Sequence, residues 1–332
     1  MISAPLLDPS IHRSTNASVS YQTHPLYSHL QVAFGFPIAN VYNNLTNVIM
    51  TIEPKRTKGR KKETAKKLLV NAHYDATLGS PGASDCASCV GVGVEVARAL
   101  LKTTKKGKTT NAVFLFNGGE ETLMQAAHGF MQWSPSAKDV GAFINIESTG
   151  PWGPDVLFQH QGWALEAYAK AAPRPRGNSV AQDFFELGVI PADTDYRVLR
   201  ESSEDAGNAG NERIPGVDVA FLFDGLAYHT KEDTWTRIRP GTLQGMGENV
   251  LAAAVEFMEV LEGQAVEKKG FDARKSVFAD VGGRIMVVYP FWLARVLHVA
   301  PLAFFLIGRA RAAGRAGLQS SSAGAGLRER DR

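Results

Sequence analysis

Apolar residues recur along the chain at two spacings, which predict strands and helices in alternation. Residues 40–53 alternate apolar and polar side chains as a half-buried strand does, and residues 67–75 (KLLVNAHYD) predict a more buried strand that pairs with it. Similar runs predict strands at 111–117, 141–148, 155–159 and 217–223. Apolar residues at helical spacing predict helices over 90–102, 124–133, 163–172 and 241–262.

The alternation of strands with helices predicts an α/β fold whose mixed, mostly parallel sheet is flanked by helices on both faces. With 332 residues and 44% hydrophobic content, the chain can form one large domain. We expect this domain at 31–264, after an N-terminal extension over 1–30. A linker and candidate transmembrane segment are expected over 265–307, and a disordered tail over 308–332.

The C-terminal part of the chain carries the one long apolar segment. Residues 285–307 are long and apolar enough to cross a bilayer, although two prolines, an arginine and a histidine interrupt them. A terminal helix packed on the domain, or a membrane region cut short in an incomplete chain, would be alternatives. The following Arg-, Ala-, Gly- and Ser-rich tail has too little apolar content to order itself. The first 30 residues do not predict a secretory signal.

The charge distribution does not favour a nucleic-acid partner. The net charge of +3 is small for this length, and the basic residues concentrate between 55 and 67. Because this run separates two predicted strands, we interpret it as a solvated loop rather than as a contact with nucleic acid or anionic lipid. The sequence does not predict an oligomeric state.

Only two cysteines occur, Cys86 and Cys89, which is too few for a disulfide-stapled framework and leaves the redox compartment undefined. Their Cys-x-x-Cys spacing also occurs in thioredoxin-like redox pairs. Here the pair directly follows Asp85 and opens an apolar helix. This position favours a packing role.

Residues suited to metal binding follow the predicted strand ends. His73 and Asp75 project to the same side, because side chains i and i+2 of a strand do so. A carboxylate that accepts a hydrogen bond from the distal ring N–H of a zinc-bound histidine orients the ring. We therefore interpret His73 as a ligand and Asp75 as its orienting partner. A surface histidine beside an incidental aspartate is the alternative.

Asp85 follows a turn that contains Gly79, Pro81 and Gly82, and it immediately precedes a predicted helix. An ordinary helix N-cap would explain an aspartate at this place. In a two-metal site, however, one carboxylate bridges ions about 3.5–4 Å apart, and a residue held rigidly at a helix start suits this task. We therefore interpret Asp85 as the bridging ligand.

Three further acids and a second histidine complete the candidate site. Glu120 and Glu121 follow a strand and a Gly-Gly step, where repulsion between adjacent acids would be costly without a cation. One of them is expected to bind metal, and the other to serve as a general base. Glu147 ends one predicted strand and His229 follows another, at the sheet edge where open α/β folds bind ligands. A solvated acidic loop and ordinary surface residues are the alternatives.

The combined donor set favours a pair of zinc ions. Imidazole nitrogens and carboxylate oxygens without a thiolate suit a catalytic zinc pair better than a structural zinc site. Two Zn²⁺ ions would be neutralised by the ligand carboxylates of Asp85, Glu121 and Glu147 together with a bridging hydroxide. The sequence therefore predicts a two-zinc hydrolase.

Five ordered blocks carry a resemblance to the co-catalytic zinc aminopeptidase family. They are NAHYD, PGASD, FNGGEE, INIESTG and YHTKEDT. The segments EETLMQAAHGFM, IPADTDYRVLR and IPGVDVAF are similar to the endoplasmic reticulum metallopeptidase branch of that family. The resemblance covers about residues 30–262, so that 31–264 would be the zinc peptidase domain.

The resemblance implies a role for each candidate residue. One zinc would be bound by His73, Asp85 and Glu147, and the other by Asp85, Glu121 and His229. Glu120 would act as the general base, and Asp75 would orient the first histidine. Tyr228 would help to stabilise the oxyanion. Asp195 and Arg197 would line the substrate cleft.

The implied function is that of a zinc-dependent exopeptidase acting on peptide substrates. It would be an aminopeptidase that hydrolyses N-terminal peptide bonds through a metal-bridging water and a glutamate general base. The alternatives are a single-zinc glutaminyl cyclase-like enzyme, a non-catalytic membrane-anchored protein that retains the peptidase fold, and a thiol redox protein based on the two cysteines.

The branch also implies a location in the endoplasmic reticulum membrane, with the catalytic domain in the lumen. Glycosylation triplets begin at Asn16 and Asn44, and they would matter only in such a compartment. Three features depart from the family pattern. Cys86 replaces an acidic or amide residue, the polar stretch 201–213 looks longer than usual, and the N-terminal membrane segment is absent.

Overall fold

The computed structural model describes residues 15–33, 36–54, 66–103, 110–190, 192–201, 213–264 and 276–328. The chain divides into two compact units. The first consists of residues 1–273 with 278–288, and the second of residues 274–277 with 289–332. The sheet and the candidate site belong to the first unit.

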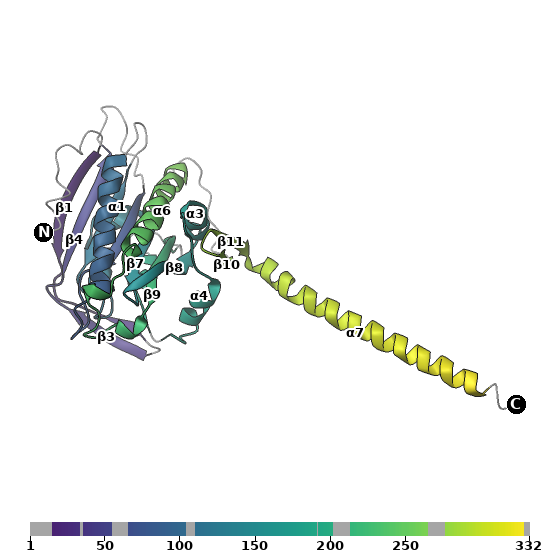
Figure 1. Cartoon of the computed structure of the whole chain (residues 1–332). Coiled ribbons are helices and arrows are strands. Elements are labelled where there is room, and N and C mark those ends of the chain that lie inside the picture. Colours follow the sequence, from purple (N-terminus) through teal and green to yellow (C-terminus); the bar gives the residue numbers. More distant parts are fainter. Residues whose placement is uncertain are drawn as a thin grey trace. The chain divides into compact units, whose positions relative to one another are not determined.

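A seven-stranded sheet in the order β1-β4-β6-β5-β7-β9-β8 organises the first unit (Figure 1). Its strands are β1 (Thr15–Thr23), β4 (Thr46–Pro54), β5 (Lys67–His73), β6 (Ala112–Asn117), β7 (Val140–Ser148), β8 (Trp152–Gln161) and β9 (Gly216–Phe223). The four central strands β6, β5, β7 and β9 run parallel, whereas β1, β4 and β8 are antiparallel to their neighbours. This arrangement confirms the predicted mixed α/β sheet.

The N-terminal part of the sheet differs from the prediction in its pairing. The predicted strand 40–53 is two strands, β3 (Phe36–Tyr42) and β4, separated by a turn. The expected pairing of β4 with β5 is wrong, because β6 lies between them and pairs with both. The basic run falls almost wholly on residues 55–65, outside the described residues. Strand β1 comes from the predicted N-terminal extension and pairs with β4.

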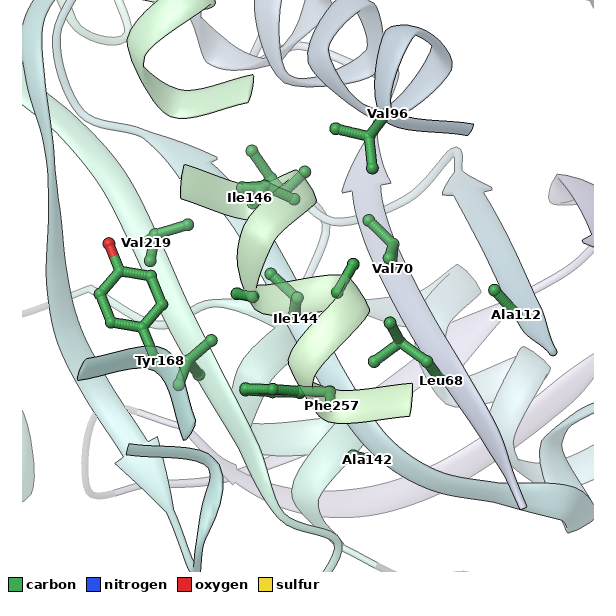
Figure 2. Close-up of a cluster of buried hydrophobic side chains, with 14 of the residues drawn as sticks. Leu68, Val70, Val96, Ala112, Ala142, Ile144, Ile146, Tyr168, Val219 and Phe257 are labelled. Atoms are coloured by element: carbon green, nitrogen blue, oxygen red, sulfur yellow. The ribbon is translucent and has the colours of Figure 1, made fainter. Parts of the chain in front are cut away.

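Helices cover both faces of the sheet. They are α1 (Cys89–Thr103), α2 (Gln125–Trp133), α3 (Ala164–Ala171), α4 (Ser179–Glu186), α5 (Asp195–Arg200) and α6 (Thr242–Gln264). Helices α1 and α6 lie side by side over one face (Figure 1). On this face Val96 of α1, Phe257 of α6 and Tyr168 of α3 pack against Val70 and Ile144 of the central strands (Figure 2).

The opposite face of the sheet is packed by α2 and α5. Because side chains alternate along a strand, Leu69 and Phe143 point to this face, where they join Phe130 of α2 and Tyr196 of α5. All four side chains are buried. Burial on both faces explains why the central strands read as nearly continuous apolar runs.

A cluster of aromatic side chains fastens the hairpin of β2 (Tyr27–Ala33) and β3 to α2. We refer to Tyr27, His29, Tyr42, His128 and Trp133 as the aromatic cluster. The rings of His29 and His128 stack with centroids 4.0 Å apart, and Tyr27 meets Trp133 edge to face at 4.7 Å. The Tyr42 hydroxyl lies 2.8 Å from Nδ1 of His128.

The aromatic cluster predicts an acid-sensitive contribution to stability. Burial, and then the positive charges of His29, His24 and Arg197, lower the pKa of His128 to about 4. The unfolded chain takes up this proton near pH 6.5. The free energy of unfolding should therefore fall as the pH drops from about 6.5 to about 4, and this loss should level off below that range. Urea unfolding midpoints at pH 7 and pH 5 measure the effect.

The His128→Gln variant provides the control for this acid effect. Glutamine can still bond the Tyr42 hydroxyl but does not titrate. The variant is expected to be less stable at pH 7, because the ring stacking is lost, and to lose less stability than the wild type between pH 7 and pH 5. Equal losses in the two proteins would contradict the role assigned to His128.

The second unit consists mainly of the helix α7 (Phe291–Arg328). Its residues Phe291–Ala313 are long and apolar enough to cross a membrane, and hardly any of them are buried. This segment begins later than the predicted 285–307, because Ile285–Pro290 form β11, which pairs with β10 (Ser276–Val281). The helix continues through most of the predicted disordered tail, whose alanines and arginines have a high helix propensity.

Candidate metal centre

The structure brings the five predicted ligands together at the carboxyl edge of the parallel strands. His73 ends β5, Glu147 lies near the end of β7, and the loops after β6 and β9 carry Glu121 and His229. Two groups of donors form, His73 with Asp85, Cys86 and Glu147, and Asp85 with Glu121 and His229. Within each group the ligand atoms all lie within 4.8 Å of one another.

Asp85 is the member common to both donor groups. Its Oδ1 lies 3.1 Å from Nε2 of His73, and its Oδ2 lies 3.1 Å from Nε2 of His229. The carboxylate is almost fully buried, at 4% exposure. Each oxygen therefore faces a different group, which is the arrangement that a bridging carboxylate requires.

The first group is held in place by Asp75. Nε2 of His73 lies 3.5 Å from Oε2 of Glu147, while its Nδ1 lies 3.1 Å from the backbone oxygen of Asp75 and 3.4 Å from the Asp75 carboxylate. The same carboxylate accepts hydrogen bonds of 3.2 Å from the backbone N–H groups of Glu120 and Glu121. Asp75 thus directs Nε2 of His73 toward the donors and fixes the turn that follows β6.

The second group joins the loops after β6 and β9. Oε2 of Glu121 lies 3.0 Å from Nε2 of His229, and its Oε1 accepts a hydrogen bond of 2.8 Å from the backbone N–H of Thr77. The ring of Tyr228 stacks on the His229 ring with centroids 3.7 Å apart. The His229 side chain is 38% exposed, so this group opens to solvent whereas the first is buried.

The electrostatics of both groups suit a cation. Burial alone would lower the pKa of His73, but the carboxylates of Glu147, Asp75 and Asp85 raise it well above its usual value. Hydrogen bonds to Asp85 and Glu121 raise the pKa of His229 to about 9. Such shifts mark a strongly negative environment, which divalent cations would neutralise. The mixed imidazole and carboxylate donors fit zinc.

Glu120 lies beside these donors without belonging to either group. Burial, and next the negative charge of Glu147, raise the pKa of the Glu120 carboxyl well above its usual range, although His73 opposes the shift. A carboxyl group with a raised pKa beside a metal site is suited to accept a proton and release it again. Burial, and next the charges of Asp85 and Glu147, likewise raise the pKa of Tyr228.

The turn that carries Asp85 is clamped by Asp233, whose role the sequence reasoning missed. Oδ1 of Asp233 accepts hydrogen bonds from the Ser84 backbone N–H at 2.9 Å and the Ser84 hydroxyl at 2.5 Å, and Oδ2 accepts one from the Asp85 N–H at 3.2 Å. Gly82 enters this turn at φ 63°, and a Cβ there would lie 2.4 Å from Cβ of Ala76. The sequence signal available was only that Asp233 lies in the YHTKEDT block with the ligand His229.

Replacing Asp233 by alanine is expected to weaken zinc binding about 10- to 100-fold, the usual effect of removing a group that orients a ligand. The three hydrogen bonds to the Asp85 turn would be lost together. Competition with a chelator of known affinity measures the change. Glu232→Ala is the matched control, because Glu232 is exposed and pairs with Arg237. Equal zinc affinity in the two variants would show that the clamp does not position Asp85.

A buried polar network lies directly beneath the metal donors. Oδ2 of Asp195 accepts hydrogen bonds from the amides of Asn71 at 2.8 Å and Asn117 at 2.5 Å. Burial, and next the charge of Glu147, raise the pKa of Asp195 to about 7. The expectation that Asp195 lines the cleft is therefore wrong, because its side chain is fully buried. Arg197 pairs with Asp193.

The same network continues to the ligand Glu147. The Asn145 amide donates to Oε1 of Glu147 at 3.2 Å and to Oδ1 of Asp218 at 2.9 Å, and the Thr194 hydroxyl donates to Oδ2 of Asp218 at 2.6 Å. The sequence reasoning did not single out these residues. The sequence nevertheless contained a signal for such a network, namely polar side chains at alternate positions of otherwise apolar strands. Asn145, two residues before Glu147, is an example.

Cys86 and Cys89 lie in the hydrophobic core, which confirms the predicted packing role, and they also form a disulfide. Both are fully buried, and they lie between Asp85 and the body of α1. The disulfide could not be predicted, because two cysteines in a helical segment do not reveal whether their sulfur atoms meet.

Comparisons with known proteins identify the family of the chain. The model of peptidase family M28 matches residues 47–254. Endoplasmic reticulum metallopeptidase 1 of Homo sapiens is 37% identical over 260 residues, which cover 77% of this chain and 27% of that protein. A vacuolar membrane protease of Yarrowia lipolytica is 30% identical over 241 residues, covering 71% of this chain and 22% of that protein. The chain thus spans about a quarter of the length of these relatives.

Two solved structures are also similar to this chain. A glutaminyl cyclase of Porphyromonas gingivalis matches with a TM-score of 0.50 and 17% identity over 77% of this chain and 88% of that one. A zinc aminopeptidase of Bacillus subtilis matches with a TM-score of 0.45 and 20% identity over 67% of this chain and 52% of that one. The former supports the α/β fold and no particular reaction.

The fold and the donor set define the class of the protein as an α/β protein with a candidate zinc centre. Because the family match covers more than half of the 332 residues, the chain belongs to peptidase family M28.

Proposed function

We propose that this chain carries the catalytic domain of a two-zinc exopeptidase, and that it acts as an aminopeptidase. The observation that carries the proposal is the position of the Asp85 carboxylate, whose two oxygens each lie 3.1 Å from a different histidine. One donor group would hold each ion, with His73 and Glu147 on one side and Glu121 and His229 on the other.

The residues around the donors would then have distinct roles in peptide hydrolysis. Zinc ions bound there would supply Lewis acidity and lower the pKa of water. Glu120 would take the proton from the attacking water and return it to the leaving amine. Tyr228, stacked on His229, would donate a hydrogen bond to the developing oxyanion. Asp75 would keep His73 oriented through the contact at its Nδ1.

The choice of an aminopeptidase rests on the order of the five sequence blocks, which resemble those of co-catalytic zinc aminopeptidases. A single-zinc glutaminyl cyclase would need only one donor group. The second group, formed by Asp85, Glu121 and His229, favours the two-metal reaction. The filled donor positions also disfavour a protein that only retains the fold.

Metal analysis combined with a substrate panel tests this proposal. We expect about two zinc ions per chain, release of free amino acids from peptides with an unblocked N-terminus, and no release from N-acetylated peptides. One zinc ion per chain with cyclisation of N-terminal glutamine would replace the proposal by the cyclase. Bound zinc without turnover of either substrate would favour a non-catalytic protein.

We further propose that the protein is associated with a membrane through Phe291–Ala313. Relatives named endoplasmic reticulum metallopeptidase and vacuolar membrane protease support this assignment, and the former support a location in the endoplasmic reticulum with the catalytic unit in the lumen. Carbonate extraction of the full chain, compared with a chain ending before Phe291, would test it. Release of both into the soluble fraction would contradict it.

A further inference from the structure

A third kind of donor lies inside the first metal group. Sγ of Cys86 belongs to the same cluster as the ligand atoms of His73, Asp85 and Glu147, and it lies 3.9 Å from Oε2 of Glu147. Ligands bound to one zinc ion at roughly 2.0–2.3 Å lie about 3.3–3.8 Å from one another in a tetrahedral site. A small shift would therefore bring this sulfur into the coordination sphere.

The disulfide determines whether this sulfur can act as a ligand. Cys86 is bonded to Cys89, and a disulfide sulfur has no negative charge to offer a metal. The free thiolate is a strong, soft zinc ligand. Cys89 itself lies toward the carbonyl of Ser84, at 3.7 Å, and belongs to neither donor group. Opening the disulfide would thus add one donor to the site rather than two.

We infer that the Cys86–Cys89 pair is a redox switch that adds Cys86 as a fourth protein ligand to the metal held by His73, Asp85 and Glu147. A dithiol supplies the two electrons. One of its thiolates attacks the disulfide, and its second thiol resolves the mixed disulfide, which leaves two cysteine thiols and an oxidised dithiol. The Cys86 thiol then loses its proton to solvent as the sulfur binds the metal.

The fourth ligand would change the kind of metal site. Catalytic zinc sites keep a position open for water or substrate, whereas structural sites are closed by four protein ligands. The reduced chain should therefore hold its metal more tightly and hydrolyse peptides more slowly than the oxidised chain. The second consequence rests on the proposed function, but the first does not.

Cobalt substitution of the full chain separates ligation from activity. Bound Co²⁺ gives visible d–d bands with any donors, and it gives a thiolate-to-cobalt charge-transfer band in the near ultraviolet only when sulfur binds it. The metal-free wild type is reduced with dithiothreitol, freed of the dithiol under argon and then loaded with Co²⁺. Because the chain contains only two cysteines, a thiol count in denaturant reports the redox state directly.

Two single variants serve as a matched pair. Cys89→Ser leaves Cys86 free without any reductant, and Cys86→Ser removes the proposed ligand. Serine can bond the carbonyls that these sulfur atoms approach, those of Ser84 and Ile146, so both variants should fold. Far-ultraviolet circular dichroism checks this. Cys89→Ala is the substitute if the serine variant unfolds.

The thiolate band is expected in the reduced wild type and in Cys89→Ser, and in neither the oxidised wild type nor Cys86→Ser. Visible d–d bands in all four samples without a thiolate band would overturn the inference and leave the two-metal proposal standing. A thiolate band in Cys86→Ser would also overturn it, because Cys89 would then be the ligand. Failure of every form to bind cobalt would overturn the inference and the proposed function together.

Discussion

Replacing Glu120 by glutamine is expected to lower the rate of peptide hydrolysis by about 10²- to 10⁴-fold, the usual contribution of a positioned general base. Glutamine has nearly the same shape as glutamate but cannot accept and return a proton at this place. Zinc content should not change, because Glu120 belongs to neither donor group. Steady-state kinetics together with metal analysis of the same preparation measure both quantities.

The neighbouring residue supplies the control for this experiment. Glu121→Gln is the same change one position further along, but Oε2 of Glu121 lies 3.0 Å from Nε2 of His229, within the second donor group. This variant should lose zinc, whereas Glu120→Gln should lose only turnover. If Glu120→Gln keeps the wild-type rate, Glu120 is not the base. If Glu120→Gln loses zinc as Glu121→Gln does, the proposed assignment of Glu120 as the base and Glu121 as a ligand is contradicted.

The location of the site could be predicted from the sequence because it depends on a simple geometric rule. Parallel strands end at a common edge, so residues at the ends of KLLVNAHYD and GAFINIES had to lie near one another. The structure places His73 and Glu147 there, with Nε2 and Oε2 3.5 Å apart. The same rule accounts for the loops after β6 and β9.

The order of the strands could not be predicted in the same way. Segments that follow one another in sequence often pair, but β4 and β5 are separated in the sheet by β6, which is contributed by residues 112–117. The alternation of apolar residues specifies which side of a strand is buried and says nothing about its neighbour.

The long-range contacts that support the ligands could not be predicted from the sequence either. Asp233 holds Ser84 across a separation of 149 residues, and Asp195 holds Asn71 across 124. Neither contact follows from spacing or periodicity, because each depends on how segments distant in the sequence meet in space, such as the start of α5 and the strand β5. Ligand residues are predictable from their chemistry and from strand ends, and so is an orienting partner two residues away, such as Asp75. Orienting partners distant in the sequence require the folded chain.

Replacing Asp85 by asparagine is expected to reduce the zinc content from the proposed two ions per chain to about one, and hydrolysis by about 100-fold or more. Asparagine keeps a single acceptor oxygen and presents an NH₂ group on its other side. In the wild type, the two Asp85 oxygens lie 3.1 Å from His73 and His229, respectively. The asparagine could therefore bind a metal ion together with only one of these two histidines. The loss of one negative charge also weakens the attraction for the second cation.

Asp224→Asn is a matched control for the Asp85 variant. Asp224 is partly exposed, pairs with Arg237 and has a φ of 63°, a conformation that asparagine adopts readily. The control removes the same charge without touching a donor group and should keep both ions. If Asp85→Asn instead binds two zinc ions and hydrolyses peptides at the wild-type rate, Asp85 does not bridge the metals. The two donor groups would then have to act independently, and the proposed mechanism would lose its structural basis.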